Sequence, residues 1–160
     1  SYCANIRVKV MLELLEKQTP YLFYLDCDSL VRRDLKDLLE LIKTCDLTFY
    51  IEKKANNKMS AKSGGIGVRN NENSLKYFRE YNGLLDAENY KIWGRDQVYL
   101  LHLYNKHLVK AKGGAMLYKP LPHEYLDWLF RKTSPIWTGK GLRKEQSGVY
   151  VKEFKQYSSK

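Results

Sequence analysis

A short apolar run that ends in two aspartates is the feature that most constrains this chain. Residues 21–25, Tyr-Leu-Phe-Tyr-Leu, are all apolar or aromatic, and Asp26 and Asp28 follow them with one residue between. A continuous run of this kind is typical of a central parallel strand that is covered on both faces. The two aspartates are therefore predicted at the carboxyl end of a buried strand, where open α/β sheets bind their ligands.

The segments around this strand alternate between helical and extended patterns. Apolar residues recur with a period of about 3.6 over residues 6–15 and again over 35–42, after a capping residue at Asp34, which predicts two amphipathic helices. Residues 47–51 predict a second short strand. Helix, strand, helix and strand in this order indicate an α/β fold. The remaining expected elements are a mobile polar loop over 52–62, a strand over 63–68, a helix capped by Asn70 or Asn71, a helix from about 95 to 104, a strand over 115–118 and a basic flexible loop over 139–144.

Length and composition bound the domain organisation. A chain of 160 residues, 44% of them hydrophobic, is long enough for one globular domain, so we predict a single domain over 1–160. The apolar stretches are far shorter than the roughly 18 residues of a membrane-spanning helix. The three cysteines, Cys3, Cys27 and Cys45, are spaced neither for a disulfide framework nor for paired zinc ligands. This favours a reducing, cytoplasmic location.

The net charge limits the classes of partner. A charge of +10 predicts a surface that attracts phosphate groups, whether on a nucleotide, on nucleic acid or on lipid headgroups. The sequence lacks the aromatic and glycine signatures of the common RNA-binding sheets, and no predicted helix concentrates basic residues on one face. We therefore expect no nucleic-acid partner, and we keep a peripheral membrane contact open. A basic nucleic-acid-binding module remains an alternative for the chain.

The two aspartates suit a divalent metal ion. Carboxylate oxygens that reach the same side of a strand end are the ligands that Mg²⁺ and Mn²⁺ prefer, and such an ion also holds phosphate oxygens. The structural alternative is that Asp28 caps the turn and Asp26 pairs with a basic side chain. A metal-dependent nucleotidyl or phosphoryl transferase would use the same pair, but it usually brings a third acidic residue or a phosphate-binding glycine loop ahead of the strand.

Several segments, in order along the chain, resemble one known family. Residues 24–31, YLDCDSLV, look like a YLDxDxLV strand, and residues 63–70, SGGIGVRN, resemble an NAGVLLIN strand. Residues 94–97, GRDQ, resemble a DQD segment, and residues 137–144, WTGKGLRK, are similar to an HxxGxxKPW segment. These motifs belong to the GT-A-fold glycosyltransferases, in particular to the glycogenin and lipopolysaccharide galactosyltransferase type.

The resemblance implies a fold, an activity and a set of site residues. The fold would be a GT-A-like (Rossmann-like) nucleotide-diphospho-sugar transferase sheet with flanking helices. The activity would be Mn²⁺- or Mg²⁺-dependent transfer of a sugar from a UDP- or GDP-sugar to a hydroxyl of a glycan or other acceptor, as in polysaccharide synthesis. The residues implied are Asp26 and Asp28 for the metal; Arg7, Asp26, Asp28, Ser63, Gly64, Gly65, Gly139 and Lys140 for the donor; and Asp96 and Gln97 for catalysis.

The same resemblance suggests roles within the site. Lys140, with Arg143, would hold the diphosphate, and the glycines beside Lys140 would let the loop close with its backbone amides facing the phosphates. An inverting enzyme would need Asp96 as a base, whereas in the retaining type, which the resemblance favours, Gln97 lies near the sugar and Asp96 binds donor or acceptor. Asp96 as a simple helix N-cap is the structural alternative. Trp93 and Trp137 offer faces for a sugar ring or belong to the core.

Three departures from the family pattern define the open questions. Thr138 stands where the family has a metal-binding histidine, which leaves the third protein ligand open and raises the alternative of an inactive glycosyltransferase-like binding domain. Ser63 replaces an asparagine. The base-binding first unit of the family has no counterpart before Ser1, so the resemblance implies an N-terminally truncated, partial domain.

Overall fold

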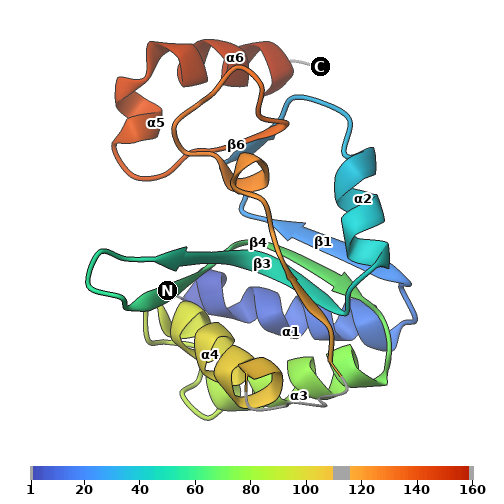
Figure 1. Ribbon diagram of the computed structural model, residues 1–160. Coiled ribbons are helices and arrows are strands. Elements are labelled where there is room, and N and C mark those ends of the chain that lie inside the picture. The colour runs from blue at the N-terminus through green and yellow to red at the C-terminus, as the bar shows by residue number, and fades with distance from the viewer. Residues whose placement is uncertain (1, 110–115, 159–160) are drawn as a thin grey trace.

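The computed structural model describes residues 2–109 and 116–158, which form a four-stranded sheet with helices on both faces and a small second sheet (Figure 1). The helices and strands are α1 (Tyr2–Glu16), β1 (Tyr21–Leu25), β2 (Ser29–Val31), α2 (Lys36–Lys43), β3 (Leu47–Lys53), β4 (Met59–Arg69), α3 (Glu72–Asp86), α4 (Arg95–Tyr104), the π-helical η1 (Asn105–Val109), β5 (Tyr118–Pro120), the 3₁₀ turn η2 (His123–Leu126), β6 (Ile136–Thr138), α5 (Arg143–Gln146) and α6 (Gly148–Ser158). This alternation confirms the predicted α/β class.

The main sheet is mixed. Its strand order is β1-β4-β3-β5, with β4 antiparallel to both β1 and β3 and with β5 parallel to β3. Strands β2 and β6 pair separately as a short antiparallel ribbon. In this register Leu25 lies opposite Gly65, so the carboxyl end of β1 meets the middle of the longer β4.

Strand β1 corrects one expectation. Its apolar run was predicted to be a central parallel strand, but its strand neighbour is the antiparallel β4, and no strand within residues 2–109 and 116–158 pairs with its other edge. The physical reason for the apolar run is that both faces are covered. Leu22 and Tyr24 pack against the core that contains α1, while Phe23 and Leu25 pack against the cluster beneath α2.

Two helical layers enclose the sheet. Helices α1, α3 and α4 lie on one face, and α2 lies on the other, with β6, α5 and α6 beyond it (Figure 1). The larger core fills the first layer, and the smaller cluster around Leu38, Ile42 and Tyr125 fills the second. A third cluster of Leu30, Trp137 and Tyr150 joins the β2–β6 ribbon to α6. Among the described residues no helix is long and apolar enough to cross a membrane.

The predicted helices are confirmed and several boundaries change. The pattern over 6–15 lies within α1, Asn71 caps α3 by accepting the Ser74 N–H at 3.0 Å, and α4 begins at Arg95. The predicted mobile loop over 52–62 is wrong for about half of its length, because β3 continues to Lys53 and β4 begins at Met59, and the two strands pair there as a largely polar hairpin.

Two weaker predictions are also revised. The strand expected over 115–118 falls partly on residues outside the described part of the chain, and β5 begins at Tyr118. The flexible loop expected over 139–144 gives way to α5 at Arg143.

Candidate active site

Two cavities open beside the carboxyl end of β1. The larger, about 720 Å³, runs along α1 and β1, and the smaller, about 390 Å³, lies between β4 and the segment after β6. Both are lined by Asp26, Asp28, Trp93 and Gln97. The DxD motif and the GRDQ segment, 66 or more residues apart in the chain, are thereby brought to one place.

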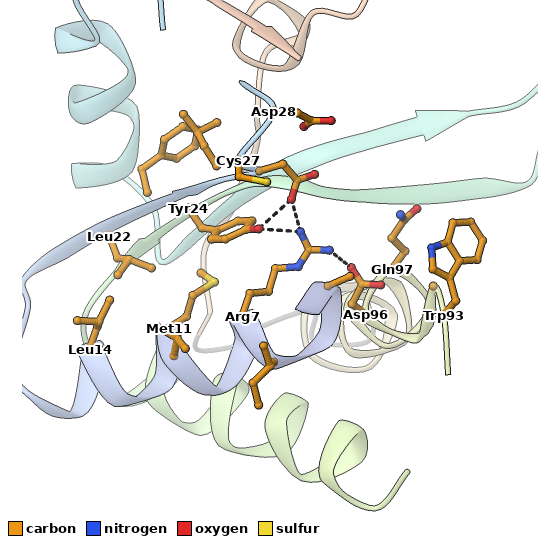
Figure 2. Close-up of a pocket in the computed structure, with 17 residues that line it drawn as sticks. Arg7, Met11, Leu14, Leu22, Tyr24, Cys27, Asp28, Trp93, Asp96 and Gln97 are labelled. Carbon is orange, nitrogen blue, oxygen red and sulfur yellow. Dashed lines mark hydrogen bonds and ion pairs between the residues drawn. The ribbon is translucent and has the colours of Figure 1, made fainter. Parts of the chain in front are cut away.

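A buried arginine organises this region (Figure 2). The Arg7 guanidinium is 8% exposed and donates through Nη1 to Asp26 and through Nη2 to Asp96. The same nitrogens reach the Tyr24 hydroxyl and the Ser63 hydroxyl, each at 3.1 Å. One cation from α1 thus joins the carboxyl end of β1, the middle of β4 and the start of α4.

The electrostatics of this network keep Arg7 charged and Tyr24 neutral. Burial opposes the charge on Arg7, but Asp26 and Asp96 outweigh burial and raise the pKa of Arg7 above its usual range. Burial, with the nearby carboxylate of Asp26, raises the pKa of Tyr24 to about 12 although Arg7 opposes this. Tyr24 is therefore a neutral donor at physiological pH, and it donates to Asp26 Oδ1 at 2.8 Å.

Asp26 is held on one side only. Its Oδ1 accepts hydrogen bonds from Arg7 and Tyr24. Its Oδ2 lies beside β4, 2.7 Å from where a Cβ atom on Gly64 would lie. The Asp26 backbone N–H also donates to the Gly64 carbonyl at 3.0 Å. The side chain is 35% exposed. Gly64 therefore leaves the room that the second carboxylate oxygen occupies.

Asp28 is anchored through its backbone. Its carbonyl accepts the Gly139 N–H at 2.9 Å and the Tyr150 hydroxyl at 2.5 Å. Its carboxylate, 35% exposed, lies 3.5 Å from the Lys144 ammonium. The Gly139 amide is thus committed to Asp28 instead of facing a phosphate, and the close contact of Gly139 with Tyr150 leaves no room for a side chain there.

The two aspartates fit a hard divalent ion with two protein ligands. Both carboxylates line the smaller cavity, and each retains exposed oxygen surface. The described residues contain no cluster of three or more His, Cys, Asp or Glu side chains suited to a metal. Thr138 lines the same cavity, and its buried hydroxyl has no hydrogen-bond partner among the described residues. Oxygens from a ligand or water would have to supply the remaining coordination.

Lys140 also lines the smaller cavity. Partial burial, together with the positive charge of the neighbouring Lys62, lowers the pKa of Lys140 although Glu52 opposes the shift. Its ammonium lies 5.1 Å from the centre of the Trp128 ring. A basic side chain expected to hold a diphosphate therefore faces the same space as the two aspartates.

The two predicted catalytic residues differ in their surroundings. Asp96 is 1% exposed, and its carboxylate receives Arg7 and the Ser63 hydroxyl, while its backbone carbonyl accepts the Tyr81 hydroxyl at 2.6 Å. Gly94, with φ of 77°, is the N-cap of α4, so the interpretation of Asp96 as an N-cap is wrong. Gln97, one residue later, is partly exposed and lines both cavities (Figure 2).

The other predicted residues divide between the site and the core. Ser63 belongs to the Arg7 network, whereas Gly65 faces Leu121, Leu126 and Phe23 in the layer beneath α2. Trp137 is 1% exposed and belongs to the core. Trp93 is 79% exposed and lines both cavities.

Sequence reasoning missed three residues of the site. Tyr24 was predicted only as part of a buried strand, but its hydroxyl donates a hydrogen bond to Asp26. Lys144, in the basic segment after β6, forms an ion pair with Asp28 at 3.5 Å. Lys62 was assigned to a loop. A tyrosine two positions before the aspartate that directly follows a strand is expected on the same face as that aspartate, which is the signal that could have identified Tyr24.

Comparison with known proteins places the fold. The crystal structure of the glycosyltransferase GlyE of Streptococcus pneumoniae TIGR4 matches this chain with a TM-score of 0.57 and 17% sequence identity. The match covers 93% of this chain and 45% of that protein, so this chain spans less than half of its length. No protein-family model and no curated protein matches the sequence. The chain therefore has a glycosyltransferase-like α/β fold.

Proposed function

We propose that this chain carries a site for metal-dependent transfer of a sugar from a nucleotide-diphosphate sugar to an acceptor hydroxyl, in glycan or polysaccharide synthesis. The observation that carries the proposal is the convergence of Asp26, Asp28 and Lys140 on one cavity at the end of β1. The glycosyltransferase-like fold supports it, since carboxylates in that position bind ligands in open α/β sheets.

Asp26 and Asp28 would hold Mn²⁺ or Mg²⁺. When bound, the ion would supply positive charge that stabilises the departing nucleoside diphosphate. Lys140, which lines the same cavity, would add a second positive charge. Because Asp26 and Asp28 would be the two acidic side chains that hold the ion, we expect its affinity for the protein to be weak until the diphosphate of the donor contributes its own oxygens.

We assign Arg7 and Asp96 to positioning. Both side chains are buried and paired with each other, which suits them to hold their neighbours in place. Their effect reaches the site through Asp26, whose Oδ1 is held by Arg7 and Tyr24. The donor contact by Arg7 and the donor or acceptor contact by Asp96 that the family resemblance implies stay proposals beside this orienting role, since both side chains also line the larger cavity.

Gln97 and Trp93 are the candidates for contact with the sugar. Both line the two cavities, and Figure 2 shows them on the same side of the Arg7 network. The Gln97 amide offers a donor and an acceptor for hydroxyl groups, and an exposed indole offers a face on which a sugar ring can stack.

An inactive, ligand-binding relative is the second candidate function. The contact between Lys144 and Asp28 favours it, because a cation already lies beside one of the two metal-binding carboxylates. Thr138 supplies a hydroxyl in place of a histidine. Such a protein would bind a nucleotide sugar without cleaving it, so hydrolysis of the donor distinguishes the two functions.

Calorimetric titration of UDP and GDP, with and without Mn²⁺, tests the proposal. We expect binding that requires Mn²⁺ and that is lost in Asp28→Asn. The matched control is Asp86→Asn, an exposed aspartate at the end of α3, which should bind like the unmodified chain. Binding that is equal with and without Mn²⁺, or that survives in Asp28→Asn, would refute the metal site.

A further inference from the structure

A third cavity adjoins the cavity of the two aspartates and shares Lys140 with it. It has a volume of about 320 Å³ and is lined by Glu52, Lys62, Trp128, Lys140 and Arg143. Lys62, Trp128 and Lys140 also line the cavity of Asp26 and Asp28, so the two spaces share a wall. A ligand in the third cavity would therefore lie next to the proposed reaction site.

Positive charge dominates this cavity. Three cationic side chains line it beside one carboxylate, and Glu52 is paired with Lys62 at 2.7 Å. Lys62 is only 14% exposed, and its positive charge lowers the pKa of Lys140. Like charges held together in a partly dry site are unfavourable unless an anion binds between them. Arg143 adds a guanidinium, the group that best matches phosphate and carboxylate oxygens.

An aromatic wall borders these charges. Trp128 packs edge to face against His123, with ring centres 4.6 Å apart, and against Tyr50 at 5.9 Å. The ring centres of His123 and Tyr50 are 5.4 Å apart, so each of the three rings packs against the other two. The indole is thereby fixed in place, with Lys140 over its ring. A flat apolar face next to cations suits a sugar ring that carries a negative charge.

We propose that the cavity between Trp128, Lys62, Lys140 and Arg143 binds an anionic sugar, one that carries a phosphate or a carboxylate group. This inference rests on the proposed function insofar as the anionic sugar would be the acceptor. The family resemblance assigned Arg143 to the diphosphate together with Lys140, but Arg143 and Glu52 line this cavity without lining that of Asp26 and Asp28. We therefore treat the cavity as distinct from the diphosphate position. The acceptor class would then be a phosphorylated sugar or a uronic acid.

Nuclear magnetic resonance can test this site without any catalytic assay. The chain has three tryptophans, so it gives three indole N–H signals, and Trp128→Phe identifies the one that belongs to Trp128. Titration with glucose 6-phosphate and with glucuronate should shift that signal saturably, whereas glucose should not. Arg143→Gln should weaken the binding of glucose 6-phosphate by about fivefold. Arg33→Gln, an exposed arginine that contacts the Lys132 carbonyl, should leave it unchanged.

Binding of UDP with Mn²⁺, measured on the same proteins, separates this inference from the proposed function. Unchanged UDP affinity in Arg143→Gln would support two distinct sites. A loss of UDP affinity as large as the loss for glucose 6-phosphate would overturn the inference, because the cations would then belong to the donor diphosphate. Equal shifts with glucose and glucose 6-phosphate would also overturn it. Binding of glucose 6-phosphate without any binding of UDP would support the anionic site and refute the proposed function.

Discussion

A Cβ atom on Gly64 would lie 2.7 Å from Asp26 Oδ2, closer than a carbon and an oxygen can approach without a shift. The neighbouring strand therefore limits where the first aspartate of the DxD motif can point. Arg7 and Tyr24 fix the other oxygen of the same carboxylate. Hydrogen bonds therefore fix Oδ1 of Asp26, and the absence of a side chain on Gly64 leaves space for Oδ2.

Gly64→Ala should impair metal-dependent nucleotide binding while the chain stays folded. The added methyl group forces the Asp26 carboxylate to turn away from its position, and we expect affinity for UDP with Mn²⁺ to fall about tenfold, with a loss of about 1–2 kcal/mol in the free energy of unfolding. Gly83→Ala, in α3 with open space around it, is the control and should be neutral or slightly stabilising. Calorimetry and urea unfolding measure both effects; equal nucleotide affinities in the two variants would contradict the assignment.

Tyr24→Phe should change the stability of the protein at alkaline pH. Burial raises the pKa of Tyr24 to about 12 from a usual value of 10, so the folded state retains the phenolic proton more strongly than the unfolded state. The stability that this provides is complete below pH 10 and is lost as the pH rises from about 10 to about 12. Urea unfolding at several pH values should therefore show a shallower decline in the variant. An identical decline in both proteins would exclude the contribution of Tyr24.

Arg7→Gln should strongly destabilise the fold. The substitution leaves the Asp96 carboxylate buried without its cation, and breaking a buried pair in this way typically costs about 3–5 kcal/mol. Arg33→Gln, at an exposed position, should change the free energy of unfolding by about 0.5 kcal/mol or less. Asp96→Asn together with Arg7→Gln should recover part of the loss, because the unpaired charge is then removed. If the double variant is no more stable than Arg7→Gln alone, the pairing is not the cause.

Lys144→Gln should increase the affinity for Mn²⁺. The Lys144 ammonium lies 3.5 Å from Asp28 and competes with a metal for that carboxylate. Because the pair is partly exposed, we expect a modest gain of about two- to fivefold. Electron paramagnetic resonance of free Mn²⁺ measures the affinity directly. Lys152→Gln, an exposed lysine of α6, is the control; a decrease in Lys144→Gln would show that Lys144 assists binding instead.

Local patterns accounted for much of the secondary structure. The period of apolar residues identified α1 and α4, and the cap of α3 was predicted as Asn70 or Asn71, of which the structure has Asn71. These signals act within a few residues. They failed where the partner strand decided the outcome, as in the polar hairpin of β3 and β4, whose residues carry no apolar alternation to reveal their pairing.

The candidate site was recognised from sequence only in part. Asp26 and Asp28 stand out because they follow an apolar run directly. Arg7 and Asp96 were named through family resemblance, and their contact was not predicted, since 89 residues separate them. Lys140 and Arg143 were named from the basic run over 139–144, but the approach of Lys62 to them was not predicted, because Lys62 comes from the distant strand β4.

The amino-acid sequence by itself determined the α/β class, most of the helices and the position of two carboxylates at a strand end, because these depend on neighbours along the chain. The tertiary structure decided that β1 lies at an edge of the sheet, that Arg7 joins Asp26 to Asp96, and that three cations gather beside Trp128. The physical reason is that burial and ion pairing depend on distances in space. Packing of α1 against β1 and α4 brings Arg7, Asp26 and Asp96 together, and no local sequence pattern predicts that contact.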